Sequence, residues 1–327
     1  MSSAAMRSGS SGRLAGVLGA TRSAGGPLLS AFVVLLVLAS LVFFSLRILP
    51  GDPSTLVLGD GAREADRVAL RARLGLDRPL AVQYAHFVVG LATLDLGDSL
   101  TRPGVPAFRE VRRALGPTAE LAGVAVLLGA VLGVALALLA VGPWFGQRRE
   151  WIHRLLIALA ATPLVAFAPI VTFVLAVRLR LVPLPGDPDS GPSGLLFASG
   201  LLAIPLAAQV GRIGRAALLE QAKQKFLDVA AAKGATPLRV WVIHALPVAS
   251  GPIFVVVATQ LGALLGGAVV LERLFERPGL GSLMLNAYAA RDLPVLEAAV
   301  VASGGLFVLA QGAASVVTAL LDPRGLP

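Results

Sequence analysis

The chain has 327 residues, of which 56% are hydrophobic and only 14% charged, with a net charge of +9 and no cysteine. A soluble domain carries about 25% charged residues, so this composition excludes a soluble enzyme, a disordered protein and a disulfide scaffold. Without cysteine there is also no thiolate nucleophile and no zinc-thiolate site. The composition predicts a membrane protein.

Six stretches of the chain lack Asp, Glu, Lys and Arg and approach or exceed the length of about 20 apolar residues that crosses a bilayer. They are residues 27–46, 121–146, 155–177, 194–210, 248–271 and 298–321. The fourth stretch is the shortest and contains Pro205. The first stretch is too long for a signal peptide and lacks an A-x-A cleavage site. We therefore predict an all-α integral membrane protein with about six transmembrane helices.

The charged residues lie unequally on the two sides that six crossings define. The side that holds both termini carries the whole net charge of +9, and the other side sums to zero. Lys and Arg accumulate in cytoplasmic loops, so we expect a multi-pass protein of the cell membrane with both termini in the cytoplasm. The basic charge is then a signal of topology in the lipid bilayer, and nucleic acid is not an expected partner.

These spans divide the chain into five parts. We expect a cytoplasmic tail at 1–26, a first transmembrane helix at 27–46, an extracytoplasmic loop subdomain at 47–120, a five-helix core at 121–321 with a cytoplasmic loop at 211–247, and a cytoplasmic tail at 322–327. Within the subdomain, residues 64–74 and 79–94 are predicted to form helices with an amphipathic face suited to the membrane surface.

Several classes of function lack the residues they need. The six stretches contain no Asp, Glu or His, which argues against an ion-coupled secondary transporter. No G-x-S-x-G or H-E-x-x-H motif exists, and the three histidines stand alone, so we expect no catalytic residue and no metal site. None of the three lysines ends a phosphate-binding Gly-Lys-Ser/Thr loop. If ATP drives this protein, another chain hydrolyses it.

The polar side chains of the stretches are mostly neutral. Gln209, Gln260 and Gln311 are candidates for lining a translocation pathway, because a glutamine amide both donates and accepts hydrogen bonds. The alternative for each is packing between helices.

All three lysines lie in the 211–247 segment, which makes it a candidate surface for a partner protein. Residues 212–233 read as one helix that ends before Gly234, a residue typical of the C′ position. Thr236 and Pro237 then predict an N-cap and first turn of a short helix that runs to Leu246. Arg239 and Trp241 can project from this short helix into a groove of a partner. The alternative is an ordinary solvated connection.

The same segment carries a family signature. Asp228-Val229-Ala230, Gly234 and His244-Ala245-Leu246-Pro247 resemble the pattern E-A-A-x3-G-x9-I-x-L-P of binding-protein-dependent ABC importer permeases. Asp228, Val229 and His244 depart from this pattern, and A-A-A-K-G with H-A-L is similar to the dipeptide, oligopeptide and nickel branch. Further segments match in order along the chain: residues 47–53, 74–84, 94–100, 278–281, 291–294 and 321–324.

The resemblance implies a type I ABC importer permease fold and a non-enzymatic transporter subunit. It also implies four kinds of partner: a second, related permease, two cytoplasmic ATPases that bind ATP and Mg, an extracytoplasmic solute-binding protein, and lipid. This chain itself would bind no cofactor. The residues that would couple it to the ATPases are Asp228, Ala230, Ala232, Lys233, Gly234, Thr236, Pro237, Arg239, Trp241 and His244.

The resemblance further implies an outer gate near a re-entrant segment at 271–294, with Pro278, Gly279, Gly281, Arg291 and Asp292 as its residues. The alternative for Arg291 and Asp292 is a local ion pair at a helix end. The expected substrate is a di- or oligopeptide. Nickel or another small solute is the alternative within the branch, and a secondary transporter or a structural membrane protein without an ATPase is the alternative outside it.

Overall fold

The computed structural model describes residues 25–48, 58, 61–146 and 148–321. By their contacts the residues form two compact units, 1–50 and 51–327. Most of the described residues are helical, and none forms a strand; one isolated bridge joins Asp98 and Pro106. The predicted fold class is confirmed.

The first unit contributes one helix, α2 (Gly25–Ile48), whose apolar window has a mean hydropathy of 2.7. It covers the predicted first span. Arg47, its only charged residue, lies with its guanidinium 3.4 Å from the centre of the Phe43 ring and donates a hydrogen bond of 3.0 Å to the Phe43 carbonyl. The ring and the carbonyl thus compensate the charge at the end of the helix.

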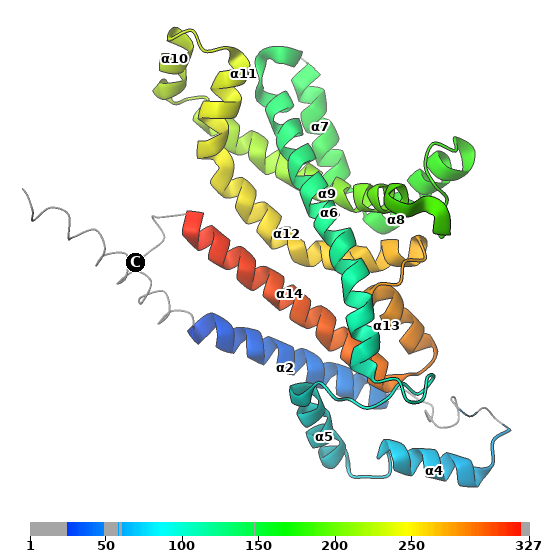
Figure 1. The fold of residues 1–327 in the computed structure, drawn as a ribbon. Coiled ribbons are helices and arrows are strands. Elements are labelled where there is room, and N and C mark those ends of the chain that lie inside the picture. The colour runs from blue at the N-terminus through cyan, green and yellow to red at the C-terminus, as the bar shows by residue number, and fades with distance from the viewer. Residues whose placement is uncertain (1–24, 49–57, 59–60, 147, 322–327) are drawn as a thin grey trace, which may run out of the picture. The chain divides into compact units, whose positions relative to one another are not determined.

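The second unit holds the other helices (Figure 1). In chain order they are α4 (Glu64–Leu74), α5 (Leu80–Thr93), α6 (Ala107–Val141), η1 (Pro143–Phe145), α7 (Arg148–Ala161), α8 (Leu164–Thr172), η2 (Phe173–Arg178), η3 (Pro188–Ser190), α9 (Gly191–Gln221), α10 (Lys225–Ala232), α11 (Pro237–Arg239), η4 (Val240–Ala245), α12 (Leu246–Leu274), α13 (Leu280–Ala289) and α14 (Leu293–Leu321). The two helices predicted at 64–74 and 79–94 are present as α4 and α5.

Helices α6 and α9 pack side by side and run in the same direction. The hydroxyl of Ser199 donates to the carbonyl of Leu121 at 3.3 Å, and further along both helices Gly133 lies against Val210. A Cβ added at Gly133 would come within 2.6 Å of the Val210 Cβ, so the two backbones approach closely only because residue 133 is a glycine. Small residues allow such close approach between membrane helices.

Because α6 and α9 are parallel, the chain between them must return along the bundle. Leu156 of α7 lies at Gly211, and Leu164 of α8 lies beside Leu202, so this segment runs opposite to α9. The span predicted at 155–177 is present as this bent pair, because α7 and α8 meet at 106°. Pro163 causes the break, because it lacks an N–H and disfavours helical backbone in the residue before it.

The remaining long helices continue the alternation. Pro237–Leu274 and Leu293–Ser315 are apolar enough to span a membrane, and the amide of Gln311 reaches the carbonyl of Thr259 at 3.5 Å between them. The described residues contain five helices that are long and apolar enough to cross a membrane, or six if the bent pair is one span. The return path between α6 and α9 supports counting it as one.

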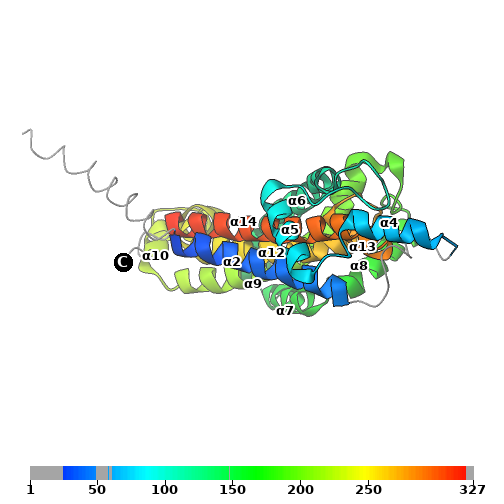
Figure 2. The same cartoon turned by 90° about the horizontal axis from the view of Figure 1, so that it is seen from below.

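This arrangement gives the second unit two ends, and Figures 1 and 2 both place α10 at one and α13 toward the other. We call the end formed by residues 222–246 and the 142–146 turn the basic-loop end. The other, formed by residues 98–106 and 275–292, is called the α13 end.

Among the helices long enough to span a membrane, α9 has the largest buried share in its most apolar segment, 56%. The mean hydropathy of that segment, 1.7, is nevertheless the lowest of these helices. Other helices surround α9, so it needs less apolar surface than a helix that faces lipid.

Several helices extend beyond the charge-free stretches from which they were predicted. Helix α6 begins at Ala107, α12 continues to Leu274 and α14 begins at Leu293. As a result Glu272 and Glu297 lie inside helices and are 0% and 5% exposed. The predicted stretches themselves contain no acidic residue, but the longer helices that include them bury two at their ends near α13, where partners within the protein replace water.

Candidate functional site

The basic-loop end contains the residues of the family signature. Helix α10 ends at Ala232, with Lys233 as its C-cap, and Gly234 has φ +85°, the left-handed conformation expected of a C′ glycine. The hydroxyl of Thr236 then accepts a hydrogen bond of 3.4 Å from the backbone N–H of Arg239, with Pro237 in the first turn. Both predicted caps are confirmed.

The helix predicted at 212–233 is in fact two helices. Helix α9 ends at Gln221, residues 222–224 turn the chain, and α10 starts at Lys225. No proline or glycine marks this break. The turn lets Leu227 and Ala230 pack on Ala137 and Val141 at the end of α6, in one apolar cluster with Val240 and Ala245. Tertiary packing thus overrides the helix propensity of the segment.

The second short helix was expected to end at Leu246, before Pro247, and this is also wrong. Helix α11, the π-helical segment η4 and α12 form one continuous span from Pro237 to Leu274. The N–H of Leu246 bonds to the carbonyl of Trp241, five residues back, and Pro247 follows in the first turn of α12. Such local widening accommodates a proline in a membrane helix.

Most of the predicted coupling residues are accessible. Asp228, Ala232, Lys233, Gly234, Thr236, Pro237 and Arg239 are exposed, Trp241 and His244 are half-buried, and Ala230 is buried. Arg239 therefore projects as expected, whereas Trp241 packs against the apolar cluster.

An apolar surface on the same loop was not predicted from the sequence. Phe226, Val229 and Leu238 are 41%, 53% and 59% exposed, although this loop is otherwise basic. Phe226 and Val229 are three residues apart, which puts them on one face of α10, while Leu227 and Ala230 point to the protein. The spacing of these two pairs is a sequence signal that could have been recognised. Large exposed apolar side chains grouped in this way are typical of a protein-binding surface.

The α13 end is built around two buried carboxylates. The first belongs to Asp292, which is 2% exposed and directly precedes α14. It accepts hydrogen bonds from the Ser99 hydroxyl, from the N–H of Leu100 at 3.1 Å, and from the N–H and hydroxyl of Thr101 at 3.3 and 3.0 Å. A turn almost two hundred residues earlier in the chain is thereby fastened to the start of α14.

The second buried carboxylate is Glu272, in the last turn of α12. It accepts hydrogen bonds from the Thr118 hydroxyl at 2.5 Å and from the N–H groups of Gly281 and Ser282 at 2.7 and 3.1 Å. Thr118 in turn accepts from the N–H of Leu280 at 2.8 Å. The free N–H groups of the first turn of α13 are thus satisfied by an anion, as the helix dipole favours.

The predicted gate residues lie around these carboxylates, apart from Pro278, which is exposed. A Cβ at Gly279 would come within 2.1 Å of the Glu272 carboxyl carbon, so this position has no room for a side chain. The alternative of a local ion pair between Arg291 and Asp292 is wrong: no such pair exists among the described residues, and Asp292 bonds to the 99–101 turn instead. Glu272 and Thr118 were missed, because their contacts join residues distant in sequence.

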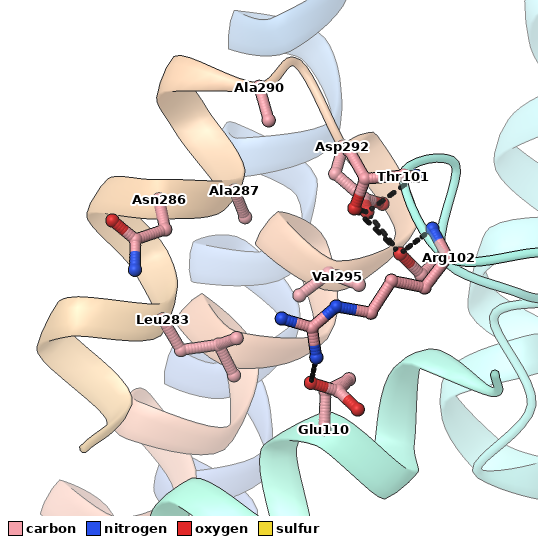
Figure 3. Close-up of a pocket in the computed structure, with 10 residues that line it drawn as sticks. Thr101, Arg102, Glu110, Leu283, Asn286, Ala287, Ala290, Asp292 and Val295 are labelled. Atoms are coloured by element: carbon pink, nitrogen blue, oxygen red, sulfur yellow. Dashed lines mark hydrogen bonds and ion pairs between the residues drawn. The ribbon is translucent and has the colours of Figure 1, made fainter. Parts of the chain in front are cut away.

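A cavity of about 320 Å³ adjoins the Asp292 carboxylate (Figure 3). Arg102 reaches across it from the 99–102 turn, and its Nη1 donates to Glu110 of α6 at 2.8 Å. The other residues that line the cavity come from the 99–101 turn, α13, and the junction with α14: Ser99, Thr101, Leu283, Asn286, Ala287, Ala290, Asp292 and Val295. Its wall is therefore polar on the side of the turn and largely apolar on the side of the helices.

A second cavity of about 170 Å³ lies at the break between α7 and α8. Gln260 lines it together with Thr162, Pro205 and Leu264. Gln209 and Gln311 are half-buried, and the Gln311 amide bonds to the α12 backbone. The structure therefore puts one of the three candidate glutamines beside a cavity and one in a helix-to-helix contact. Among the described residues no group of three potential ligands could hold a metal ion.

Comparison with known proteins gives consistent matches over most of the chain. Residues 125–325 match the family "Binding-protein-dependent transport system inner membrane component", and residues 26–107 match the N-terminal model of the same kind of component. A probable peptide ABC transporter permease of Sinorhizobium fredii is 30% identical over 307 residues, covering 91% of this chain and 96% of the relative.

Two further comparisons agree. A glutathione transport system permease of Salmonella typhimurium is 32% identical over 301 residues, covering 90% of this chain and 96% of the relative. A structure of a methionine ABC transporter in inward-facing conformations superimposes with a TM-score of 0.55 at 18% identity, covering 66% of this chain and 97% of that one. The latter supports the fold alone.

The family matches, the full-length relatives and the signature placed on α10 and its turn lead to one conclusion. The chain belongs to the binding-protein-dependent inner membrane components, the permease subunits of ABC importers, within their dipeptide and oligopeptide branch, and is a multi-pass protein of the inner membrane.

Proposed function

We propose that this chain forms half of the translocation pathway of an ATP-driven importer of di- or oligopeptides. ATP and Mg are bound by separate ATPase chains, a second permease completes the pathway, and a solute-binding protein delivers the substrate. The observation that carries this proposal is the basic-loop end, where α10 is anchored by Leu227 and Ala230 and presents Phe226 and Val229 outward.

The basic loop transmits the motion of the ATPases. Its exposed apolar residues fit a groove on a partner, and Lys225, Lys233 and Arg239 beside them favour an acidic rim. The ten predicted coupling residues, from Asp228 to His244, form or support this surface. Because α11 continues into α12 without a break, a push on the loop acts directly on a membrane helix.

The α13 end is the outer gate. Glu272 and Asp292 bind the two ends of α13 to α6 and to the 99–101 turn, so these segments hold a common geometry. Gly279 and Gly281 allow the close approach, and Arg291 and Pro278 flank it. Gln260 and, less directly, Gln209 and Gln311 provide polar groups along the pathway. For Gln311 its bond to Thr259 favours the packing alternative.

The charges indicate that the basic-loop end and both termini face the cytoplasm. Single cysteines test this orientation in a chain that has none of its own. A cysteine at Asp189, which is exposed, should react with an impermeant thiol reagent in intact cells, and one at exposed Ala232 should not. Ser99 is unsuitable as a labelling site because it is 4% exposed. The reverse labelling pattern would overturn the orientation.

The peptide substrate is supported by the relatives, whose names refer to peptides and to glutathione. The test is uptake by vesicles that contain this chain with its partner permease, ATPases and binding protein. We expect ATP-dependent uptake of labelled dipeptides and tripeptides. Uptake of nickel alone would select the alternative substrate of the branch. Uptake driven by an ion gradient without an ATPase would reject the whole proposal.

A further inference from the structure

The cavity beside Asp292 has a free cationic hydrogen-bond donor. The guanidinium of Arg102 carries five N–H groups, and one bond to Glu110 is the interaction it makes among the described residues. Its side chain is 65% exposed, while its backbone N–H donates to the Ser99 hydroxyl at 3.1 Å. The turn thus fixes the backbone of Arg102, while most N–H groups of its guanidinium remain available to a ligand.

The acidic groups of the cavity are already occupied. Asp292 accepts from both the 99–101 backbone and two hydroxyls. Glu110 is 11% exposed and lies between Arg102 and Arg113, at 2.8 and 3.1 Å. If Arg102 turned to a ligand, Arg113 would still pair with Glu110. With both carboxylates occupied, the hydrogen-bonding groups of Arg102 that remain available are all donors, which suit a ligand group that carries acceptor oxygens.

The shape of the cavity limits this ligand to one with an organic body. Asn286 of α13 lies across from Arg102 (Figure 3). Its side-chain amide makes no hydrogen bond among the described residues, so this amide can bind a peptide group. Leu283, Ala287 and Val295 provide an apolar surface beside it. A volume of about 320 Å³ lies at the lower end of the range of about 300–1,000 Å³ for small-molecule sites.

We propose that this cavity binds the C-terminal carboxylate of the transported peptide. Arg102 holds the carboxylate through the paired N–H groups of its planar guanidinium, a geometry that carboxylates match. Asn286 contacts the last peptide group, and the apolar surface receives the last side chain. The proposal rests on the peptide-import function above. It assigns a substrate contact to this chain at the end of the bundle opposite the basic loop.

The test uses the complete transporter in lipid nanodiscs, without the solute-binding protein. A single cysteine replaces Ala290, which is exposed and lines the cavity, and the rate at which this chain reacts with a thiol reagent is followed. The probes are tri-alanine and tri-alanine amide, which differ only in the terminal carboxylate. We expect tri-alanine to slow the reaction at concentrations at which the amide does not.

Variants in the same background decide whether Arg102 is responsible. Arg102→Met should raise the concentration of tri-alanine needed for half-protection roughly tenfold or more, as expected for loss of charge-assisted hydrogen bonds. Arg102→Lys should have an intermediate effect, because lysine keeps the charge without the planar fork. Arg112→Met is the matched control, an exposed arginine of α6 outside the cavity, and should protect like the parent.

Equal protection by the acid and the amide, no protection by either, or an unchanged half-protecting concentration in Arg102→Met would overturn the proposal. Uptake of tri-alanine by the parent transporter in vesicles is measured separately. If uptake occurs without specific protection, the carboxylate site is wrong and the import function stands. If no peptide is imported, the proposed import function is wrong, whatever the protection experiment shows.

Discussion

The two ends of the helix bundle are held by different kinds of contact. At the basic-loop end, Leu227 and Ala230 of α10 pack on Ala137 and Val141, and these contacts are entirely apolar. At the α13 end, Glu272 and Asp292 together accept seven hydrogen bonds, most of them from a distant part of the chain.

The difference has a mechanical consequence. Apolar packing is not directional, so it allows α10 to tilt or slide while Leu227 and Ala230 stay buried. Hydrogen bonds to a carboxylate depend on distance and angle, so α13 keeps one position relative to α6. A loop that follows a moving partner needs the first kind of contact. A gate that must return to the same closed geometry needs the second.

The largest effect should follow from removing the buried carboxylate of Glu272. Glu272→Ala leaves the Thr118 hydroxyl and the N–H groups of Gly281 and Ser282 without their acceptor. Each unsatisfied buried group costs about 1–3 kcal/mol, so we expect a loss of about 3–5 kcal/mol, measured as a lower denaturation midpoint in detergent. Glu276→Ala, at an exposed position nearby, is the control. An equal midpoint for both variants would show that the carboxylate does not hold α13.

A somewhat smaller effect is expected midway between the ends, where α6 contacts α9. Gly133→Val places a Cβ within 2.6 Å of Val210 and 2.8 Å of the Ala207 carbonyl. Overpacking of this kind costs about 1–3 kcal/mol, and it should reduce the amount of folded protein recovered by size-exclusion chromatography. Gly123→Val in the same helix meets nothing within 4 Å and should behave like the parent. Full recovery of Gly133→Val would mean that α6 and α9 do not pack as described.

Two neighbours on α10 should give opposite results if the basic-loop end combines anchoring and docking. Leu227→Ala truncates a side chain that is 6% exposed and should cost about 2 kcal/mol in stability. Phe226→Ala, at 41% exposure, should leave the stability within about 0.5 kcal/mol and instead weaken co-purification with the ATPases. If Phe226→Ala retained full ATPase association, the exposed apolar face would have no role in docking.

The last prediction concerns Gly234, whose φ of +85° a β-branched residue adopts poorly. Gly234→Val should cost about 1–2 kcal/mol locally, while ATP-driven uptake in vesicles should fall strongly because the turn after α10 is displaced. Gly251→Val is a control on α12, where no atom lies within 4 Å of the new Cβ. Unchanged uptake and unchanged ATPase association in Gly234→Val would remove the basic loop from the coupling path.

Local features of the fold could be predicted from the sequence with good accuracy. Long charge-free stretches identify the membrane helices, because charge is costly in lipid. The glycine at 234 and the Thr236-Pro237 pair identify a turn, because their backbone preferences act within a few residues. The proline that breaks α7 from α8 was visible as well, but its effect, a bend of 106° rather than a kink, depends on the helices around it.

The contacts that define the α13 end could not be predicted in this way. Nothing near Asp292 in the chain indicates that it bonds to Ser99 and Thr101, and a local ion pair with Arg291 was the simpler expectation. Glu272 looked like an ordinary loop residue at the end of an apolar stretch. Each contact forms between segments that only the packing of α6, α12 and α14 brings together.

Composition, helix caps and a short signature act locally, so the amino-acid sequence was enough to establish a membrane-spanning protein, its basic end and its family. Two features depend instead on packing in three dimensions: α9 breaks before α10, and two buried carboxylates fasten α13. A buried acidic group is tolerated where enough donors surround it, and these donors come from distant parts of the chain.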